Sequence, residues 1–348
     1  MAKKGKKPST SRSRSPKRTA KKKPPAGPVV DPEAESPDVA PGPGISSFEK
    51  DRLHRIIGDE IQNRGLETEE EINALLAEFS GRSIDEILDA HAMTPEEEAR
   101  RVLEENEETE DVEEIIDTCV EALEKDPHCI EAKMTLALAA SESIEEAILR
   151  IKTAIVEHED YWGREYMEEH RGHFWGVVDT RPYMMARAQL VQLYGIAGFF
   201  VLAAREAEEM LELNPSDNQG IRDPLRGFYL ALNRLDALKA LNAKYEDGAF
   251  ATPAWSVALG LFLEGKQKQA EKAAAKAHAA NPHVLDLLAG RKAPPEERPA
   301  MYSLGSPEEA YLCAENLAGA CIEHPDLAEW LEGLKGLGEK KAGKRKRK

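Results

Sequence analysis

Two histidines and two glutamates form the densest group of metal-type ligands in the sequence. His170 and His173 lie three residues apart, and Glu168 and Glu169 come directly before them. On a helix, such residues could ligate a metal ion from one face. Neither HExxH nor another complete ligand set is present, so a metal-dependent enzyme centred on these histidines is the least favoured function. We favour a solvated or capping pair beside Trp175.

Three arginines form the second candidate group. Arg181, Arg187 and Arg222 could line a groove and pair with an acidic ligand, because the planar guanidinium suits carboxylate or phosphate. The alternative is that they tie an irregular segment, 160–180, to the helices that follow through ion pairs and aromatic stacking. We favour this structural role, since a repeat protein needs such ties where its period is broken.

Motifs for other chemistries are missing from the sequence. No phosphate-binding GxGxxG or GxxxxGK[ST] loop and no GxSxG elbow occurs, and no Cys or Ser has recognisable triad company. The many acidic residues are spread along expected helix faces, where they favour solubility and i,i+4 pairing with Lys or Arg. We therefore predict a protein that is not an enzyme and has no cofactor.

The charge of the chain is segregated. The formal net charge is −17, yet residues 1–30 hold eleven Lys or Arg and no acid, and residues 335–348 hold eight with only Glu339. Such tails could attract RNA or DNA phosphates, while the acidic body between them would repel nucleic acid. Only Phe48 lies near the N-terminal tail, so base stacking is not supported. A nucleic-acid-associated protein is the alternative function.

The sequence favours a reduced, cytoplasmic protein. The cysteines are few and scattered, without a CxxC pair, and the basic N-terminus continues into prolines rather than an apolar signal core. The longest nearly apolar stretch, 187–205, contains Gln189 and Gln192 and is shorter than the roughly 20 residues of a spanning helix. We expect a buried helix pair that turns near Gly195 and Gly198, and no membrane span. The four cysteines are Cys119, Cys129, Cys313 and Cys321.

Helix-start signals divide the chain. Residues 1–47 contain almost no large apolar side chain and should form a disordered basic, proline-rich tail. An N-terminal helical segment is expected over 48–93, a helical domain over 94–334 and a second basic tail over 335–348. Five capping boxes, with a hydroxyl at N-cap and a carboxylate three residues later, predict many short helices. They begin at Thr68, Thr94, Ser83, Ser143 and Ser306.

A local pattern recurs before three prolines. Small or apolar residues at helical spacing lead to Asp126-Pro127, Asn214-Pro215 and Asn281-Pro282. The last two prolines lie 67 residues apart, close to two tetratricopeptide repeats of about 34 residues, and the first two lie 88 apart. The surplus of about 20 predicts an insertion at 160–180 in an all-α solenoid of tetratricopeptide-like helix pairs. The residues expected to pack between the helices include Ala203, Ala207, Val257, Leu261, Ala270, Ala274 and Ala277.

Five segments of the chain have distinctive motifs: HFWG at 173–176, TRPYM at 180–184, LNPSDNQGIR at 213–222, AKYED at 243–247 and ANPHV at 280–284. These motifs resemble a family of bacterial tetratricopeptide proteins that is related to the eukaryotic suppressor of tumorigenicity 7 proteins. The resemblance covers about 94–332 and implies an α-solenoid without an established enzymatic activity. It departs from the family at three places. The eukaryotic relatives have membrane segments and some bacterial ones a Cys-rich metal-binding tail, neither of which occurs here, and Pro224 interrupts an expected helix, which should restart with Asp223 as N-cap.

These observations predict a protein-protein interaction scaffold. Stacked helix pairs would form a concave face, lined by the first helix of each pair, that receives a peptide or protein partner. Thr180 is expected to cap the helix that carries the first candidates. The candidate partner-binding residues are Arg181, Tyr183, Arg187, Gln192, Arg222, Trp255 and Phe262.

Overall fold

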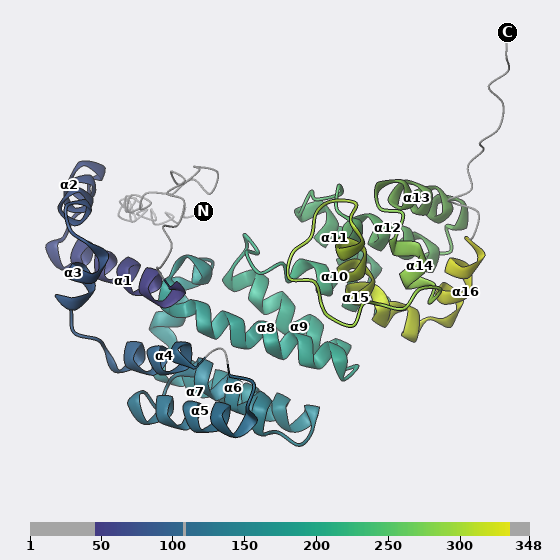
Figure 1. The fold of residues 1–348 in the computed structure, drawn as a ribbon. Helices are drawn as coiled ribbons and strands as arrows, with labels where there is room; N and C mark the ends of the chain where they lie inside the picture. The colour runs from purple at the N-terminus through teal and green to yellow at the C-terminus, as the bar shows by residue number, and fades with distance from the viewer. Residues whose placement is uncertain (1–45, 107–108, 335–348) are drawn as a thin grey trace, which may run out of the picture. The chain divides into compact units, whose positions relative to one another are not determined.

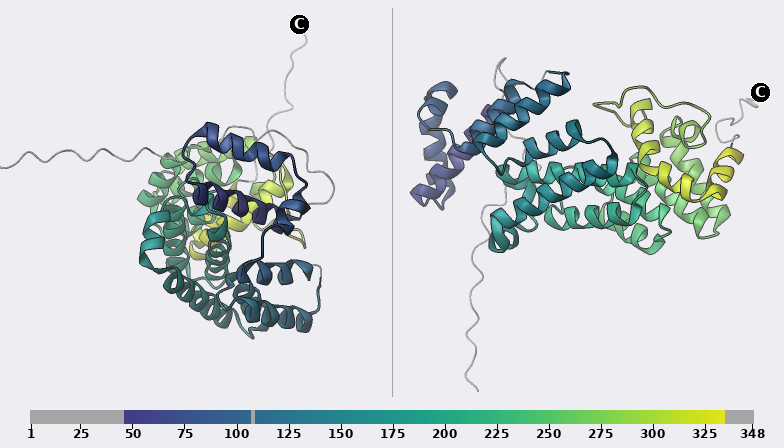
Figure 2. Two further views of the ribbon diagram at one scale, coloured as in Figure 1. Left: turned by 90° about the vertical axis from the view of Figure 1, so that its left-hand side faces the viewer. Right: turned by 90° about the horizontal axis from the view of Figure 1, so that it is seen from below.

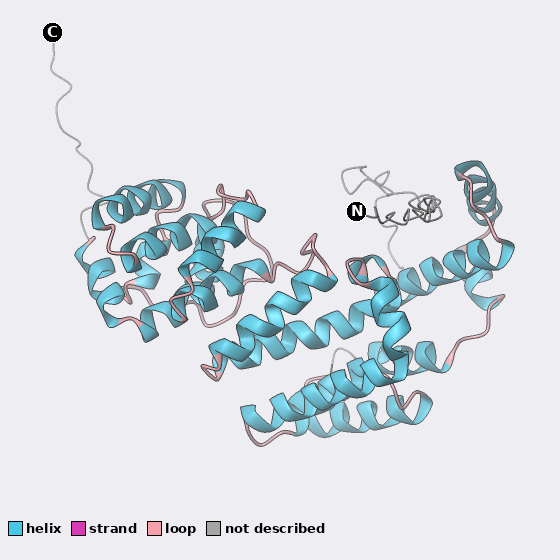
Figure 3. Cartoon of the chain, turned by 180° about the vertical axis from the view of Figure 1, so that it is seen from behind, coloured by secondary structure: helices cyan, strands magenta, loops and turns pink. Residues whose placement is uncertain are grey.

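The computed structural model describes residues 46–106 and 109–334. Within these ranges every regular element is a helix, and the views of Figures 1 and 3 contain no strand. The prediction of an all-α protein is confirmed. Both predicted basic tails lie outside the described residues, apart from Ser46 and Ser47.

Sixteen α-helices and two 3-10 helices occur in the described part of the chain. The first eight are α1 (Ser47–Arg64), α2 (Glu69–Ser80), α3 (Ile84–Asp89), α4 (Pro95–Glu105), α5 (Val112–Lys125), α6 (Ile130–Ala140), α7 (Ile144–His170) and α8 (Arg181–Ile196). The others are α9 (Phe200–Leu213), α10 (Arg222–Ala231), α11 (Leu235–Lys244), α12 (Ala251–Leu263), α13 (Gln267–Ala280), α14 (Val284–Leu288), α15 (Pro307–Glu323) and α16 (Pro325–Gly333). The 3-10 helices η1 (Phe174–Gly176) and η2 (Val178–Thr180) lie between α7 and α8.

The predicted helix starts are confirmed, with two variations. Complete capping boxes open α2, α3 and α4, and a fourth, which the sequence analysis missed, opens α1 at Ser46. Ser143 and Ser306 accept a hydrogen bond from the N3 amide, but the N3 carboxylates do not return to the N-cap amide. Glu309 instead accepts from the amides of Gly305 and Ala251, and so links α15 to α12.

Two expected N-caps are wrong. Thr180 precedes α8, but its hydroxyl donates to the carbonyl of Phe174 and makes no cap. Helix α10 begins at Arg222 rather than after Asp223, because Asp217 reaches forward and accepts from the amides of Ile221 and Arg222 at 2.7 and 3.0 Å. A carboxylate from the preceding loop therefore satisfies the helix start that the sequence assigned to a neighbour of Pro224.

Helices that follow one another in sequence pack as neighbours from α4 through α13 (Figure 2). Helices α5, α9 and α13 end directly before Asp126, Asn214 and Asn281, as the three proline signals predict. The expected small residues at these contacts are buried: Ala203, Ala207, Ala270, Ala274 and Ala277. Val257 is a correction, because 42% of it is exposed on α12.

The turn between α8 and α9 also follows the prediction. Helix α8 ends at Ile196, and Gly198 adopts a left-handed φ of 74°, a conformation open to glycine, before α9 begins at Phe200. The segment predicted to interrupt the period, 160–180, holds the end of α7 and both 3-10 helices. Gly163, with φ 77° and ψ 164°, kinks α7 inside this segment. No helix in the described ranges combines the length and apolar character needed to cross a membrane.

Helix α15 departs from the order of sequence neighbours. It lies against α10 and α12, far earlier in the chain, as well as against α14 (Figures 1 and 2). Gly227 makes the contact possible, since a Cβ there would lie 2.9 Å from the carbonyl carbon of Asn316 and closer still to its oxygen. At the far end His324 Nε2 lies 3.0 Å from the carbonyl oxygen of Leu230. This return of the chain creates the site described next.

Candidate functional site

A pocket of about 570 Å³ lies between α8, α10, the start of α12 and α15. Its volume falls in the range of ligand-binding pockets, and most of its lining is apolar or aromatic. We call it the α8–α15 groove. The residues that line it include Gln192, Ile196, Phe200, Asp223, Phe228, Phe250, Arg298, Tyr302, Glu309, Glu315, Asn316, Gly319 and Ile322.

Glycines bring the walls of the groove together at two further points. Gly319 of α15 lies against the ring of Phe200, where a Cβ would be 2.9 Å from the ring tip. Gly195 of α8 lies beside Phe228, with the nearest ring carbon 3.2 Å from an ideal Cβ. The two phenylalanine rings meet at a centroid distance of 6.1 Å. Helices α8, α9, α10 and α15 thus converge on one aromatic pair.

One end of the groove exposes apolar surface. Ile196 closes α8 and is 63% exposed, and Ile322 near the end of α15 is 73% exposed. Both line the groove near Phe200, whose ring is half-buried. Phe199 and Leu202, which flank the same turn, are also exposed. Water contacts this apolar surface in the free chain, so a ligand that covered it would gain from burial.

The other end of the groove is polar and acidic. The carboxylate of Glu309 is buried and accepts hydrogen bonds from the amides of Ala251 and Gly305 and from Asn281 Nδ2, at 2.7–2.9 Å. None of these donors carries a positive charge. Asp223 lines the same end with 30% of its side chain exposed. Burial raises the pKa of the Tyr302 hydroxyl there, and the carboxylates of Asp223 and Glu309 raise it further.

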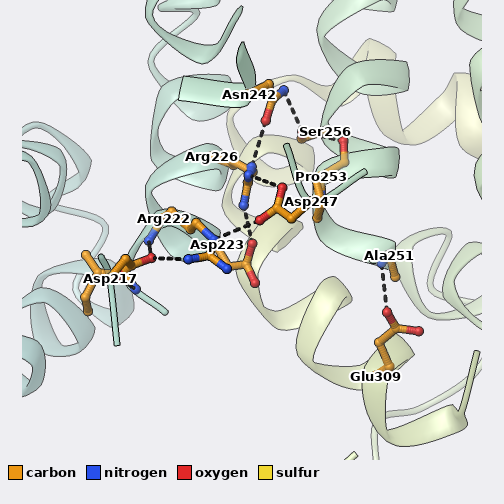
Figure 4. Close-up of polar contacts among 11 residues, drawn as sticks. Asp217, Arg222, Asp223, Arg226, Asn242, Asp247, Ala251, Pro253, Ser256 and Glu309 are labelled. Atoms are coloured by element: carbon orange, nitrogen blue, oxygen red, sulfur yellow. Dashed lines mark hydrogen bonds and ion pairs between the residues drawn. The ribbon is translucent and has the colours of Figure 1, made fainter. Parts of the chain in front are cut away.

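A network of ion pairs stands behind this acidic end (Figure 4). Arg226 is fully buried and donates to Asp223, to Asp247 at 2.8 Å and to Asn242 at 2.7 Å. Arg222 joins the carboxylates of Asp217 and Asp247, at 3.3 and 2.8 Å. Three carboxylates therefore share two guanidinium groups, and burial raises the pKa of Asp217 and Asp223.

The network also fixes the helices around it. Asn242 of α11 accepts from Arg226 of α10 and donates to Ser256 Oγ of α12 at 3.2 Å. Arg226 and Asn242 together thus connect three consecutive helices. Because each polar group has a partner, this cluster is a fixed frame for the groove rather than a free binding group.

The rim of the groove carries an ion pair whose two charges cancel. Arg298, from the loop before α15, lies 3.0 Å from Glu315, and both side chains are substantially exposed. The hydroxyl of Tyr311 also donates to Glu315, at 3.3 Å. Gln192, which lines the groove from α8, is also exposed. The rim can therefore form hydrogen bonds with a ligand without breaking a buried hydrogen bond of the protein.

The structure separates the first three partner-binding candidates from the groove. Tyr183 is buried and donates to Glu159, and Arg187 is buried between Glu206 and the Tyr183 hydroxyl. Arg181 donates to the carbonyl of Trp175 and lies 3.5 Å from Asp51. These contacts are intramolecular ties of the kind favoured by the sequence.

Of the other four candidates, Gln192 alone lines the groove. Arg222 belongs to the ion-pair network. Trp255 is fully buried, and Phe262 is half-buried and stacks on Trp330 at 4.7 Å. The structure therefore brings no two of the seven candidates together at one accessible site.

The histidine candidates take structural positions. His170 stacks on Tyr166 at 4.1 Å and has Nδ1 3.0 Å from the Tyr166 carbonyl oxygen. His173 precedes η1. In residues 46–106 and 109–334, no three His, Cys, Asp or Glu side chains gather closely enough to hold a metal ion.

Apart from Gln192, sequence reasoning missed the residues that form the groove, because α15 contributes one entire wall. Gly227 within the apolar run of α10 and Gly319 within α15 were available signals, since glycine inside a helix often marks a close approach. Nothing in the local sequence pairs them with Asn316 and Phe200. The chain matches no protein-family model, and it has no significant similarity to a curated protein.

Proposed function

We propose that this protein is a non-enzymatic interaction scaffold that binds a peptide or protein partner in the α8–α15 groove. The observation that carries the proposal is the exposed apolar surface around Ile196, Phe200 and Ile322, which continues into a pocket of about 570 Å³ with fixed polar groups at its other end. Apolar anchors held in a preformed pocket, with a few polar contacts at its edge, are typical of peptide-binding sites.

The helical framework fits such a role. We infer that the neighbouring helix pairs from α4 to α13 are tetratricopeptide-like and form a solenoid, in line with the resemblance of their motifs to that class. In such repeats the first helices line the inner face, where partners bind. Helix α15 covers this face over α10 and α12, and the groove lies beside α8 at the edge of the covered part.

The state of the polar groups favours binding over catalysis. Glu309 receives three neutral donors and is buried, and Asp223 is paired with Arg226, so neither carboxylate is free to exchange protons with a substrate. Cys313 is buried near them, and burial raises its pKa well above that of an ordinary thiol. A nucleophile needs exposure and an adjacent base, and this cysteine has neither.

A display selection tests the proposal. Random twelve-residue peptides are selected on the full-length protein, and the affinities of the selected peptides are then measured on variants by fluorescence polarisation. Gln192→Trp and Ala318→Trp introduce bulk at exposed positions that line the groove, whereas Val201→Trp adds the same bulk at an exposed position outside it. We expect the first two variants to weaken binding at least about tenfold, a loss typical of blocking a binding hot spot, and the third to retain it.

Two results would overturn the proposal. Selected peptides that bind all three variants equally would place binding elsewhere on the chain. Failure of every selected peptide to bind in solution would leave the groove without the role assigned to it.

A further inference from the structure

The two ends of the α8–α15 groove differ in chemistry and lie a definite distance apart. Glu309 marks the acidic end and Gly319, against Phe200, the apolar end, and both belong to α15. Ten residues of α-helix separate them, which corresponds to about 15 Å. A single ligand side chain cannot satisfy both ends, so the ligand needs two different groups joined by a spacer.

The acidic end carries negative charge that the protein does not balance. In the network, Asp217, Asp223 and Asp247 face only Arg222 and Arg226, which leaves one negative charge. Glu309 adds a second, because its hydrogen-bond donors are neutral. Arg298 and Glu315 cancel each other at the rim. A cationic ligand group is therefore favoured here, and an anionic one would be repelled.

The basic tails of this chain are poor occupants of the apolar end. Neither residues 1–45 nor residues 335–348 contain an aromatic residue, and the C-terminal tail has Leu337 as its one large aliphatic side chain. Charge alone would draw the tails toward many acidic surfaces of the body. Leu337, with Lys340 and Lys341 three and four residues further on, combines an aliphatic side chain with a cation at a suitable spacing. The rings of Phe200 and Phe228 at the apolar end favour an aromatic anchor, which neither tail contains, and this points to a separate partner.

Resting on the proposed function, we infer that the groove binds an extended segment of a separate peptide or protein, with one aromatic residue and, three to five residues away, a Lys or Arg. The aromatic residue covers Ile196, Phe200 and Ile322. The cation lies at the acidic end, where the charges of Asp223 and Glu309 attract it while their own hydrogen bonds stay intact. Extended chain advances about 3.4 Å per residue, so three to five residues, with the reach of a Lys or Arg side chain, span the distance.

The test uses the peptides selected on the full-length protein. Each is synthesised as selected, with its Lys or Arg replaced by citrulline or glutamine, and with its aromatic residue replaced by alanine. Binding is measured on the unaltered protein and on Glu315→Gln, which leaves Arg298 without its partner and makes the rim more positive. Asp236→Asn, at a fully exposed carboxylate on α11, is the matched control for the general acidity of the body.

We expect Glu315→Gln to lower the affinity of the cationic peptides about fivefold and Asp236→Asn to change it less than about twofold. The affinity of the neutral peptides should be the same on both variants as on the unaltered protein. Replacing the aromatic residue should weaken binding about tenfold or more. Cationic peptides that respond equally to both protein variants would show unspecific attraction and overturn the inference.

The remaining outcomes separate this inference from the proposed function. Peptides that are blocked by Gln192→Trp but carry no required cation would refute the inference and leave the groove as a binding site. A synthetic peptide of residues 335–348 that displaced them with equal affinity would make the chain's own tail the occupant and also refute it. Peptides indifferent to Gln192→Trp would refute both.

Discussion

Substitution of Gly227 by alanine should destabilise the protein, although helix propensity alone favours the opposite result. Alanine in a helix interior is favoured over glycine by about 1 kcal/mol. At Gly227, however, the added Cβ would lie 2.9 Å from the carbonyl carbon of Asn316 and nearer to its oxygen. Both are backbone atoms of α15, so no side-chain rotation can relieve the clash.

The size of the effect follows from what α15 must give up. Local overpacking costs about 1–3 kcal/mol. If α15 moves away, the fully buried Cys313, Leu317 and Ala320 lose contacts with α10 and α12, and burial of one leucine-sized side chain contributes about 1.5–3 kcal/mol. We expect the free energy of unfolding to fall by about 3 kcal/mol.

Urea denaturation followed by far-ultraviolet circular dichroism measures this change. Gly58→Ala is the control, because Gly58 lies exposed within α1 and an added Cβ there has no neighbour within 4 Å. The control should be neutral or slightly more stable. A Gly227→Ala midpoint equal to or above that of the unaltered protein would refute the close contact between α10 and α15, and with it the wall of the groove.

Three further predictions concern the polar interior. Arg226→Gln should lower stability by about 3–5 kcal/mol in urea, because it leaves the carboxylates of Asp223 and Asp247 without their buried partner, whereas Arg150→Gln, at an exposed pair, should cost under about 1 kcal/mol. Burial and the neighbouring Asp179 raise the pKa of Glu96 to about 7, so the stability that its protonated form contributes is complete at low pH and is lost as the pH rises through 7. Glu96→Gln should therefore reduce the fall in the urea midpoint between about pH 5.5 and 8. An unchanged fall would exclude this carboxyl as its cause. Thr180→Val should cost about 1–2 kcal/mol in thermal or urea unfolding, since the carbonyl of Phe174 loses a buried donor, and a neutral result would mean that this hydroxyl is dispensable.

Capping residues and prolines in the sequence predict where helices start and stop. Hydroxyl and carboxylate pairs such as Thr94 and Glu97 fix helix starts through contacts three residues apart, and Asn281 before Pro282 fixes a helix end. These signals depend only on near neighbours, so a single sequence reveals them. They failed at α10, where Asp217 reaches forward from the preceding loop to the helix start.

The groove itself depends on contacts that local patterns do not encode. Gly227 and Asn316 are far apart in the sequence, as are Phe200 and Gly319, and nothing in either segment specifies the other. The candidate residues chosen from the sequence were large or charged, and most of them, such as Trp255 and Arg187, stabilise the fold in buried contacts. The groove is instead lined by residues that are brought together and left accessible by the packing of α15 against α10 and α12.

The most direct test of the groove as the binding site is photocrosslinking of a selected peptide to the full-length protein. A photoreactive aliphatic diazirine amino acid, close to glutamine in size so that it does not block the groove, is placed at Gln192, which lines the groove, or at Val201, which is exposed outside it. We predict a crosslinked product from position 192, with the peptide attached through residues near its apolar anchor, and none above background from position 201. Equal crosslinking from both positions, or crosslinking from position 201 alone, would contradict the assignment of the groove.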